Sequence, residues 1–181
     1  MIYMFLANGF EEVEALTPLD LLRRAGANVR TVGIGSRQIT GAHGITVLAD
    51  TLDSELSDLS SEMIILPGGM PGTLGLAESG VVKASLDAAK ENGAFIAAIC
   101  AAPSVLGKYG LLDGKNATCF PGFEDSLLGA TCSQSGVCRD GKIITAAGMG
   151  VALEFGLALV DALYGKKKSD ELFVSTQAHR R

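Results

Sequence analysis

The chain has 181 residues, of which 48% are apolar and 19% charged, which is a globular and not a disordered composition. This length predicts one domain with a sizeable core, and we expect residues 1–181 to form it. A net charge of −5 and the lack of tryptophan argue against a nucleic-acid partner. No segment has the run of about 18 apolar residues that a membrane span needs, and the first residues lack a signal-peptide pattern. We therefore expect a cytoplasmic protein with no membrane partner.

Predicted strands and helices alternate along the chain. An apolar strand at residues 1–7 precedes a helix at residues 11–25, in which Pro18 predicts either a kink or a new helix start capped by Thr17. A second strand at residues 28–35 leads to a hairpin around residues 41–44. The later strands are predicted at residues 63–66, 94–100, 115–120 and 142–147, and the later helices at residues 81–93, 102–112, 149–165 and 169–179.

Several of these strands are apolar on both faces, which is typical of a parallel sheet covered by helices on both sides. The pattern therefore predicts an α/β fold. In such folds ligands bind beyond the carboxyl ends of the strands. The candidate segments are then ANGFEE, LPGGMPG and ICAAP, since each of them follows a strand.

Cys100 stands where a buried strand turns into a helix, among small alanines that leave room for an exposed nucleophile. Backbone N–H groups at the start of the helix would stabilise a thiolate, so we expect the pKa of Cys100 to lie well below that of free cysteine. A buried cysteine that packs as a small apolar side chain fits the same pattern. The residues alone leave both interpretations open.

Two further segments offer partners for this sulfur. Gly68 and Gly69 can present backbone N–H donors, which with that of Ala101 would form an oxyanion hole; an ordinary glycine turn is the simpler interpretation. Glu11 and Glu14 share one helical face, where acidic residues also suit the helix dipole. A carboxyl buried beside the sulfur would keep its proton and donate a hydrogen bond, and Glu14 is the candidate.

Together and in this order, these segments resemble the ThiJ/PfpI superfamily, and specifically its DJ-1-like branch. The matching segments are GFEEVEAL with PLDLLRRAG, IILPGG, AAICAAP, IITAAGMG and EFGLALVDALYGK, so the likeness spans nearly the whole chain. The resemblance implies a flavodoxin-like three-layer sandwich with a mostly parallel sheet, which forms homodimers. It also implies that Cys100 is an oxidation-prone nucleophile, that Glu14 is its protonated partner, and that Gly69 and Ala101 offer backbone donors.

The chain departs from this family pattern at three places. Many members of the branch carry a histidine before the proline that borders the site, whereas Phe120 stands there and cannot transfer protons. Protease-like relatives carry a histidine directly after the cysteine, where this chain has Ala101. Glutamine amidotransferases of this fold need a late histidine motif, which His179 with the two arginines after it does not supply.

Four residues are expected as further lining of the pocket: Glu11, Gly68, His43 and Phe120. For His43 an exposed turn of the hairpin is the simpler interpretation. The four cysteines and two histidines lack the spacing of a zinc site, so we predict no metal, and in a cytosolic protein the cysteines would be reduced.

The sequence therefore favours a cysteine-dependent enzyme without a cofactor, acting on α-oxoaldehydes or on early glycation adducts as a glyoxalase or deglycase does. The alternative is a non-enzymatic sensor of oxidative stress, through oxidation of Cys100. Relatives are also labelled for thiazole monophosphate (thiamine) biosynthesis, but we find no phosphate site in these residues. The expected partners are a second copy of the chain and a small carbonyl substrate or a glycated side chain.

Overall fold

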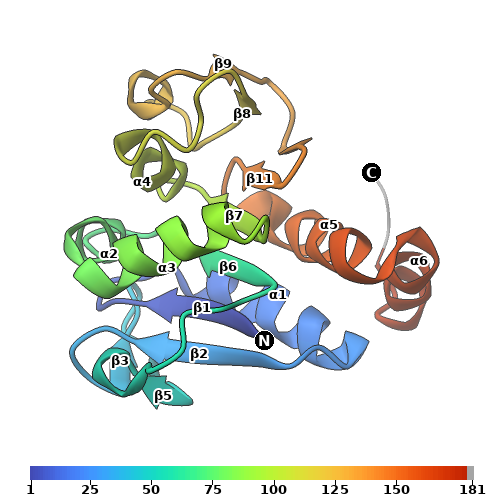
Figure 1. The fold of residues 1–181 in the computed structure, drawn as a ribbon. Coiled ribbons are helices and arrows are strands. Elements are labelled where there is room, and N and C mark those ends of the chain that lie inside the picture. Colours follow the sequence, from blue (N-terminus) through green and yellow to red (C-terminus); the bar gives the residue numbers. More distant parts are fainter. Residues whose placement is uncertain (179–181) are drawn as a thin grey trace.

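A seven-stranded sheet forms the middle layer of the protein, and helices cover both of its faces (Figure 1). The structure is a computed structural model that describes residues 1–178, so His179 and the two arginines after it lie outside the described residues. The strand order is β10-β11-β7-β6-β1-β2-β5; β10 pairs antiparallel with β11, and the other pairs are parallel. This arrangement confirms the predicted flavodoxin-like α/β sandwich with a mostly parallel sheet.

The strands match most of the predicted ones and add three short ones. The predicted hairpin is present as β3 and β4, which pair antiparallel, whereas the short β5, β9 and β10 were not expected. The strands of the sheet are β1 (Ile2–Leu6), β2 (Val29–Gly33), β5 (Thr51–Leu52), β6 (Met63–Leu66), β7 (Phe95–Ile99), β10 (Val137–Asp140) and β11 (Ile143–Ala146). Two small separate ribbons are formed by β3 (Gln38–Thr40) with β4 (Thr46–Leu48), and by β8 (Asn116–Ala117) with β9 (Thr131–Cys132).

The helices also follow the predicted pattern, with one addition. The new one is α2 (Gly72–Glu78), and the others are α1 (Glu12–Ala25), α3 (Gly80–Glu91), α4 (Pro103–Lys108), α5 (Ala152–Tyr164) and α6 (Lys166–Ser175). Helix α1 runs through Pro18 without a new start, so capping by Thr17 is wrong. The carboxylate of Glu11 caps this helix instead, since it accepts a hydrogen bond of 2.7 Å from the backbone N–H of Glu14.

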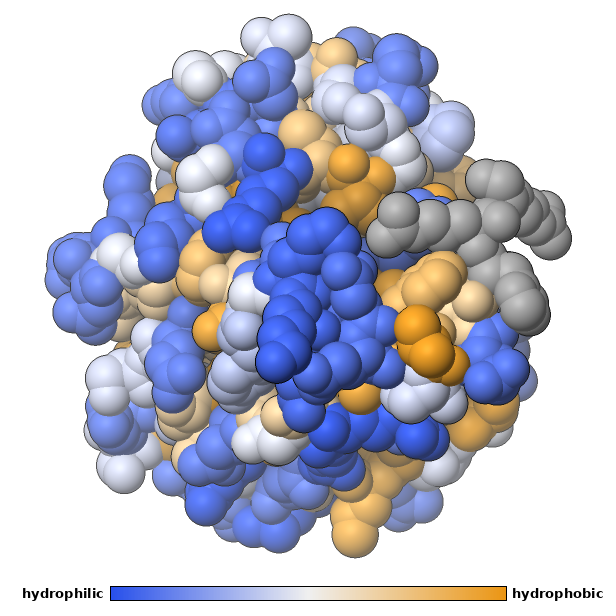
Figure 2. All heavy atoms as spheres, turned by 90° about the vertical axis from the view of Figure 1, so that its right-hand side faces the viewer, coloured by the Kyte–Doolittle hydropathy of each residue, from blue (hydrophilic) through white to orange (hydrophobic). Residues whose placement is uncertain are grey.

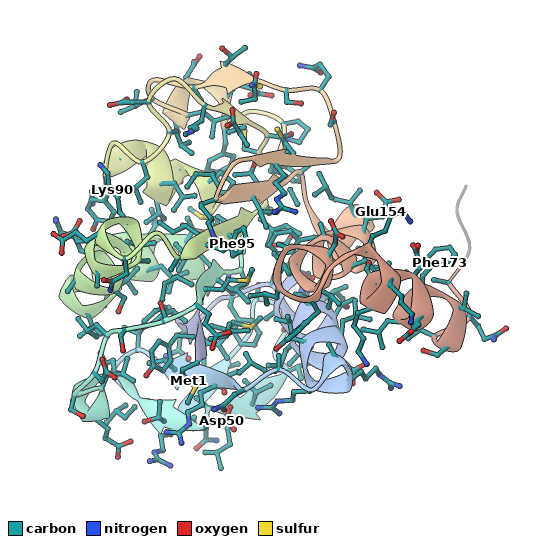
Figure 3. The ribbon with its side chains drawn as sticks, turned by 45° about the vertical axis from the view of Figure 1, so that its right-hand side comes forward. Met1, Asp50, Lys90, Phe95, Glu154 and Phe173 are labelled. Atoms are coloured by element: carbon teal, nitrogen blue, oxygen red, sulfur yellow. The ribbon has the colours of Figure 1, made fainter. Side chains whose placement is uncertain are left out.

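Alternate residues of the central strands pack into two separate hydrophobic cores, one on each face of the sheet. In β1, Ile2 and Met4 pack in the core under α1 and α5, whereas Tyr3 and Phe5 pack in the core under α2, α3 and α4. Side chains from the sheet and the helices fill the space between the layers (Figure 3). Burial on both faces explains why these strands are apolar throughout instead of alternating with polar residues.

Much of the apolar surface of α1 and α5 is buried inside the protein, because the two helices pack against each other. A methyl group at Gly156 of α5 would lie 2.6 Å from Cδ1 of Leu21 and 2.9 Å from Cα of Pro18, so the helices approach closely there. On the face around α6, hydrophilic side chains predominate and apolar ones lie in scattered groups (Figure 2). Within residues 1–178, no helix combines the length and the apolar character that crossing a bilayer would take.

Candidate active site

Cys100 occupies the turn between β7 and α4 with a strained backbone. Its φ of 65° is one that residues other than glycine rarely adopt. Two hydrogen bonds of 2.8 Å hold this turn: the N–H of Cys100 donates to the carbonyl of Ala146, and the N–H of Phe120 donates to the carbonyl of Cys100. The cysteine is partly exposed, and the sulfur therefore stands at the carboxyl edge of the sheet instead of packing fully in the core.

The loop after β6 passes the sulfur so closely that it has no room for side chains. A methyl group at Gly68 would lie 2.6 Å from Cβ of Cys100, and one at Gly69 would lie 2.3 Å from the backbone nitrogen of Glu11. Gly69 also has a φ of 91°, which glycine adopts without strain. The backbone N–H groups of Gly69 and Ala101 are directed at the sulfur, so the structure brings these two predicted donors to Cys100.

Glu14 reaches the same place from the first turn of α1. Its side chain is 1% exposed, it interacts with the thiol of Cys100, and its Oε2 accepts a 3.1 Å hydrogen bond from the N–H of Gly68. The backbone N–H of Met149, after β11, also donates to this carboxyl. The carboxyl and the thiol thus form a pair at the meeting point of three strand ends.

Both groups of this pair bind their protons more tightly than usual. Burial raises the pKa of Glu14 to about 7; the charge of Glu11 adds to the rise, and hydrogen bonds with Cys100, Gly68 and Met149 offset part of it. Burial likewise raises the pKa of Cys100 to about 12, and the charge of Glu14 and its hydrogen bond with the thiol add to the rise. The backbone donors of Ala101 and Gly69 lower the pKa by less than this. The expectation of a thiol pKa well below that of free cysteine is therefore wrong.

The physical reason is that one carboxylate and one thiolate cannot easily share a buried site. When either group ionises, its charge makes it harder for the other to lose a proton. The two raised pKa values therefore favour a state in which the pair keeps a proton. Proton transfer from the sulfur to the carboxyl then produces a thiolate beside a neutral acid without a second buried charge.

Glu12, which directly follows Glu11, connects the β3–β4 hairpin to α1 through hydrogen bonds. Its carboxylate accepts hydrogen bonds from the N–H groups of His43 (2.8 Å) and Ile45 (3.3 Å) and lies 2.9 Å from Nδ1 of His43. Burial works against ionisation of Glu12, but these hydrogen bonds, with that of His43 foremost, hold its pKa below the usual range. The hydrogen bond from His43 to Glu12 and the charge of that carboxylate raise the pKa of His43.

The His43 side chain is 70% exposed and faces Glu12 and Glu11, not the sulfur. Glu11, Glu12 and His43 bring possible ligand atoms within 4.8 Å of one another, but the hairpin already uses the oxygens of Glu12. Glu12 was not predicted as a site residue, because its charge alone gave no sign that the hairpin would bury it.

Phe120 and Met149 each hydrogen-bond to one residue of the pair through the backbone, Phe120 to Cys100 and Met149 to Glu14. Both are about half exposed, and they line the same open cavity. Phe120 was predicted from the sequence and Met149 was not, although Met149 follows the carboxyl end of β11, and ligands of such folds bind beyond the carboxyl ends of strands. Of the other cysteines, Cys119 is buried, Cys132 is exposed and Cys138 is half-buried, and all are unpaired.

Comparison with known proteins identifies the family of the chain. Residues 1–162 match the DJ-1/PfpI family. The chain belongs to the DJ-1/PfpI family. It is 39% identical over 172 residues to protein DJ-1 homolog A of Arabidopsis thaliana, with 92% of this chain but only 44% of that protein aligned. It is 32% identical over 164 residues to the glutathione-independent glyoxalase DJR-1.2 of Caenorhabditis elegans, covering 90% of this chain and 87% of that protein.

A solved structure of Toxoplasma gondii DJ-1, described as oxidized, has the same fold with a TM-score of 0.95 at 34% identity, over 99% of this chain and 98% of that one. Within this DJ-1/PfpI protein, the aromatic ring of Phe120 stands where the sequence analysis expected many relatives to carry a histidine. Among the described residues, the titratable side chain that acts on the sulfur is that of Glu14, from α1.

Proposed function

We propose that this protein is a cofactor-free enzyme of the glyoxalase type, in which Cys100 attacks an α-oxoaldehyde and Glu14 moves the protons. The observation that carries the proposal is the contact of the partly exposed thiol of Cys100 with the buried carboxyl of Glu14, beside the backbone N–H donors of Gly69 and Ala101. A carboxyl whose pKa is about 7 suits proton transfer at neutral pH. The name of the Caenorhabditis elegans relative supports the same activity.

The reaction begins as the thiol proton passes to Glu14 and Sγ bonds to the aldehyde carbon. The N–H groups of Gly69 and Ala101 stabilise the charge that develops on the aldehyde oxygen, and the proton held by Glu14 then makes it the hydroxyl of a hemithioacetal. The carboxylate next removes the hydrogen of that carbon as a proton and returns it to the neighbouring carbonyl carbon, while the hydroxyl proton of the hemithioacetal passes to the neighbouring carbonyl oxygen. One carbon is thereby oxidised to a thioester and its neighbour is reduced to an alcohol.

Water completes the reaction at the thioester carbon. The carbon gains a hydroxyl group, its bond to Sγ breaks, the sulfur regains its proton, and a 2-hydroxy acid leaves. The overall change is addition of one water molecule with an internal oxidation and reduction, so no external redox partner is needed. The same attack applies to early glycation adducts of cysteine, lysine or arginine, which are the second substrate class of the proposal.

Lactate formation from methylglyoxal tests the enzyme. We expect turnover in the wild type, none in Cys100→Ser, and a loss of roughly a hundredfold or more in Glu14→Gln, the size typical of a lost acid–base group. Cys138→Ser is the matched control, because that cysteine is equally half-buried but belongs to β10. Absence of lactate with the wild type, or equal rates with Cys100→Ser, would discard the proposal.

A redox sensor is the second candidate, because the partly exposed sulfur has amide donors that would hold sulfinate oxygens. The relative described as oxidized also favours it. Each peroxide molecule would transfer one oxygen atom to Sγ and leave as water. Mass spectrometry after mild peroxide treatment should then find oxidation at Cys100 before the other cysteines, and equal oxidation of all four would count against a sensor.

A homodimer is the third part of the proposal. Val13 of α1 and Ile45 and Leu48 of the hairpin are 42%, 55% and 76% exposed, on two elements that Glu12 joins. Exposed apolar side chains on two joined elements suit the symmetric contact of two identical chains. Light scattering should show a dimer that Leu48→Asp weakens, and a monomeric wild type would remove this part while leaving the chemistry untouched. The cytoplasmic location stays a prediction.

A further inference from the structure

A cavity of about 340 Å³ is lined by two segments that hydrogen-bond to Cys100 and to Glu14. Its lining residues belong to the loop after β8 and to the turn between β11 and α5. Its lining residues are Phe120, Pro121, Ala147, Gly148, Met149, Gly150 and Val151. These residues come from two segments, which the Cys100 turn holds together through the hydrogen bonds of its own N–H and carbonyl.

Two residues that line the cavity form backbone hydrogen bonds with the two residues of the reactive pair. Phe120 donates its N–H to the carbonyl of Cys100 at 2.8 Å, and the backbone N–H of Met149 donates to the carboxyl of Glu14. Between them, a methyl group at Gly148 would lie 3.2 Å from Cδ2 of Phe120 and 3.8 Å from Oε1 of Glu14. A group attached to the carbon that Sγ attacks would therefore have this space beside it.

The chemistry of the lining is apolar. Among the residues lining this cavity there is no charged side chain and none that can donate or accept a conventional hydrogen bond. The larger side chains are Phe120 and Met149, which are 47% and 54% exposed and so present their surface to a ligand. An aromatic ring and a thioether offer favourable contacts to another ring or to an alkyl group, and the lining side chains offer no charge to a phosphate.

We propose that this cavity binds the side group of the substrate, and that the preferred α-oxoaldehydes carry an aromatic or large alkyl group. The inference rests on the proposed function and adds its specificity. The aldehyde carbon lies at Sγ of Cys100, the oxygens face the backbone donors, and the side group lies between Phe120 and Met149. These two residues are then specificity-determining residues that take no part in proton transfer.

Turnover of two substrates gives the first test. The wild type should have a higher kcat/KM for phenylglyoxal than for methylglyoxal, and Phe120→Ala should lose this preference by roughly threefold to tenfold, the size of one aromatic contact. Phe120→Leu should retain part of it, and Met149→Ala should reduce it. Leu128→Ala is the control, because Leu128 is an exposed apolar residue outside the cavity. An equal ratio of the two substrates in wild type and Phe120→Ala would overturn the assignment.

A second test is independent of turnover. Alkylation of Cys100 by N-phenyl iodoacetamide and by iodoacetamide forms an S–C bond, breaks the C–I bond, and releases iodide and the thiol proton. Rates followed by mass spectrometry, each divided by the rate with N-acetylcysteine, should favour the phenyl reagent in the wild type and in Leu128→Ala but not in Phe120→Ala.

The two tests separate the two proposals. If the phenyl preference depends on Phe120 but neither aldehyde is converted, the cavity assignment stands and the glyoxalase proposal fails. If both aldehydes are converted without any preference that depends on Phe120 or Met149, the glyoxalase proposal stands and the cavity assignment fails.

Discussion

Substituting Gly68 by alanine should separate the two groups of the reactive pair. The added methyl would lie 2.6 Å from Cβ of Cys100 and 2.6 Å from Oε2 of Glu14, about 0.8 Å short of the 3.4 Å at which ordinary contact begins. Neither residue can move away from the added methyl, because Glu14 is buried and the strained backbone of Cys100 is held by hydrogen bonds. The substitution forces no left-handed backbone, so space alone decides its effect.

Overpacking of this kind costs about 1–3 kcal/mol. For a chain of this size that corresponds to a melting temperature lower by roughly 2–12 °C. Thermal unfolding followed by circular dichroism measures it, and Gly80→Ala is the matched control, since a methyl at Gly80 meets nothing within 4 Å. The control should melt at or slightly above the wild-type temperature, because alanine suits a helix better than glycine does. If Gly68→Ala and Gly80→Ala melted together, the close approach at the pair would be refuted.

Three further substitutions test the electrostatics and the packing. Folding raises the pKa of Glu14 from 4.5 to about 7, so its contribution to stability is fully present below the unfolded pKa of this carboxyl. As the pH rises through 7, the wild type should lose up to about 3 kcal/mol of unfolding free energy, whereas Glu14→Gln should not. The same pH dependence of the unfolding free energy in both proteins, measured by denaturant titration, would contradict this. The pKa of His43 is raised above 6.5, so its contribution is present below that pH and is lost as the pH rises through the folded pKa. The melting temperature of His43→Ala should accordingly fall below that of the wild type more in acid than in alkali, and a constant difference would refute the pairing with Glu12. Gly156→Ala should destabilise the protein by about 1–3 kcal/mol, because the methyl meets Leu21 and the Pro18 backbone; chemical denaturation equal to that of Gly80→Ala would contradict that contact.

The sequence alone determined the sandwich and the neighbourhood of the site. Strands that are apolar at every position, such as residues 94–99, can only be covered on both faces, and that requirement leads to a parallel sheet with helices on each side. Parallel strands place their carboxyl ends at one edge, which is why the segments with Glu14, Gly69 and Cys100 could be grouped before their positions were known. The path of α1 through Pro18 was left open, because a proline disfavours a helix interior locally and only the packing of α1 against α5 shows that the helix continues.

Only the tertiary structure decided the electrostatics. The direction of the Cys100 pKa depends on how deeply the sulfur and the Glu14 carboxyl are buried together, and burial depends on segments that are distant in sequence. The tie between Glu12 and the hairpin and the placement of Met149 beside Glu14 arise in the same way, from contacts across the fold. Hydrophobic periodicity is a local property that a sequence displays directly, whereas the charge state of a buried group is set by everything that surrounds it in space.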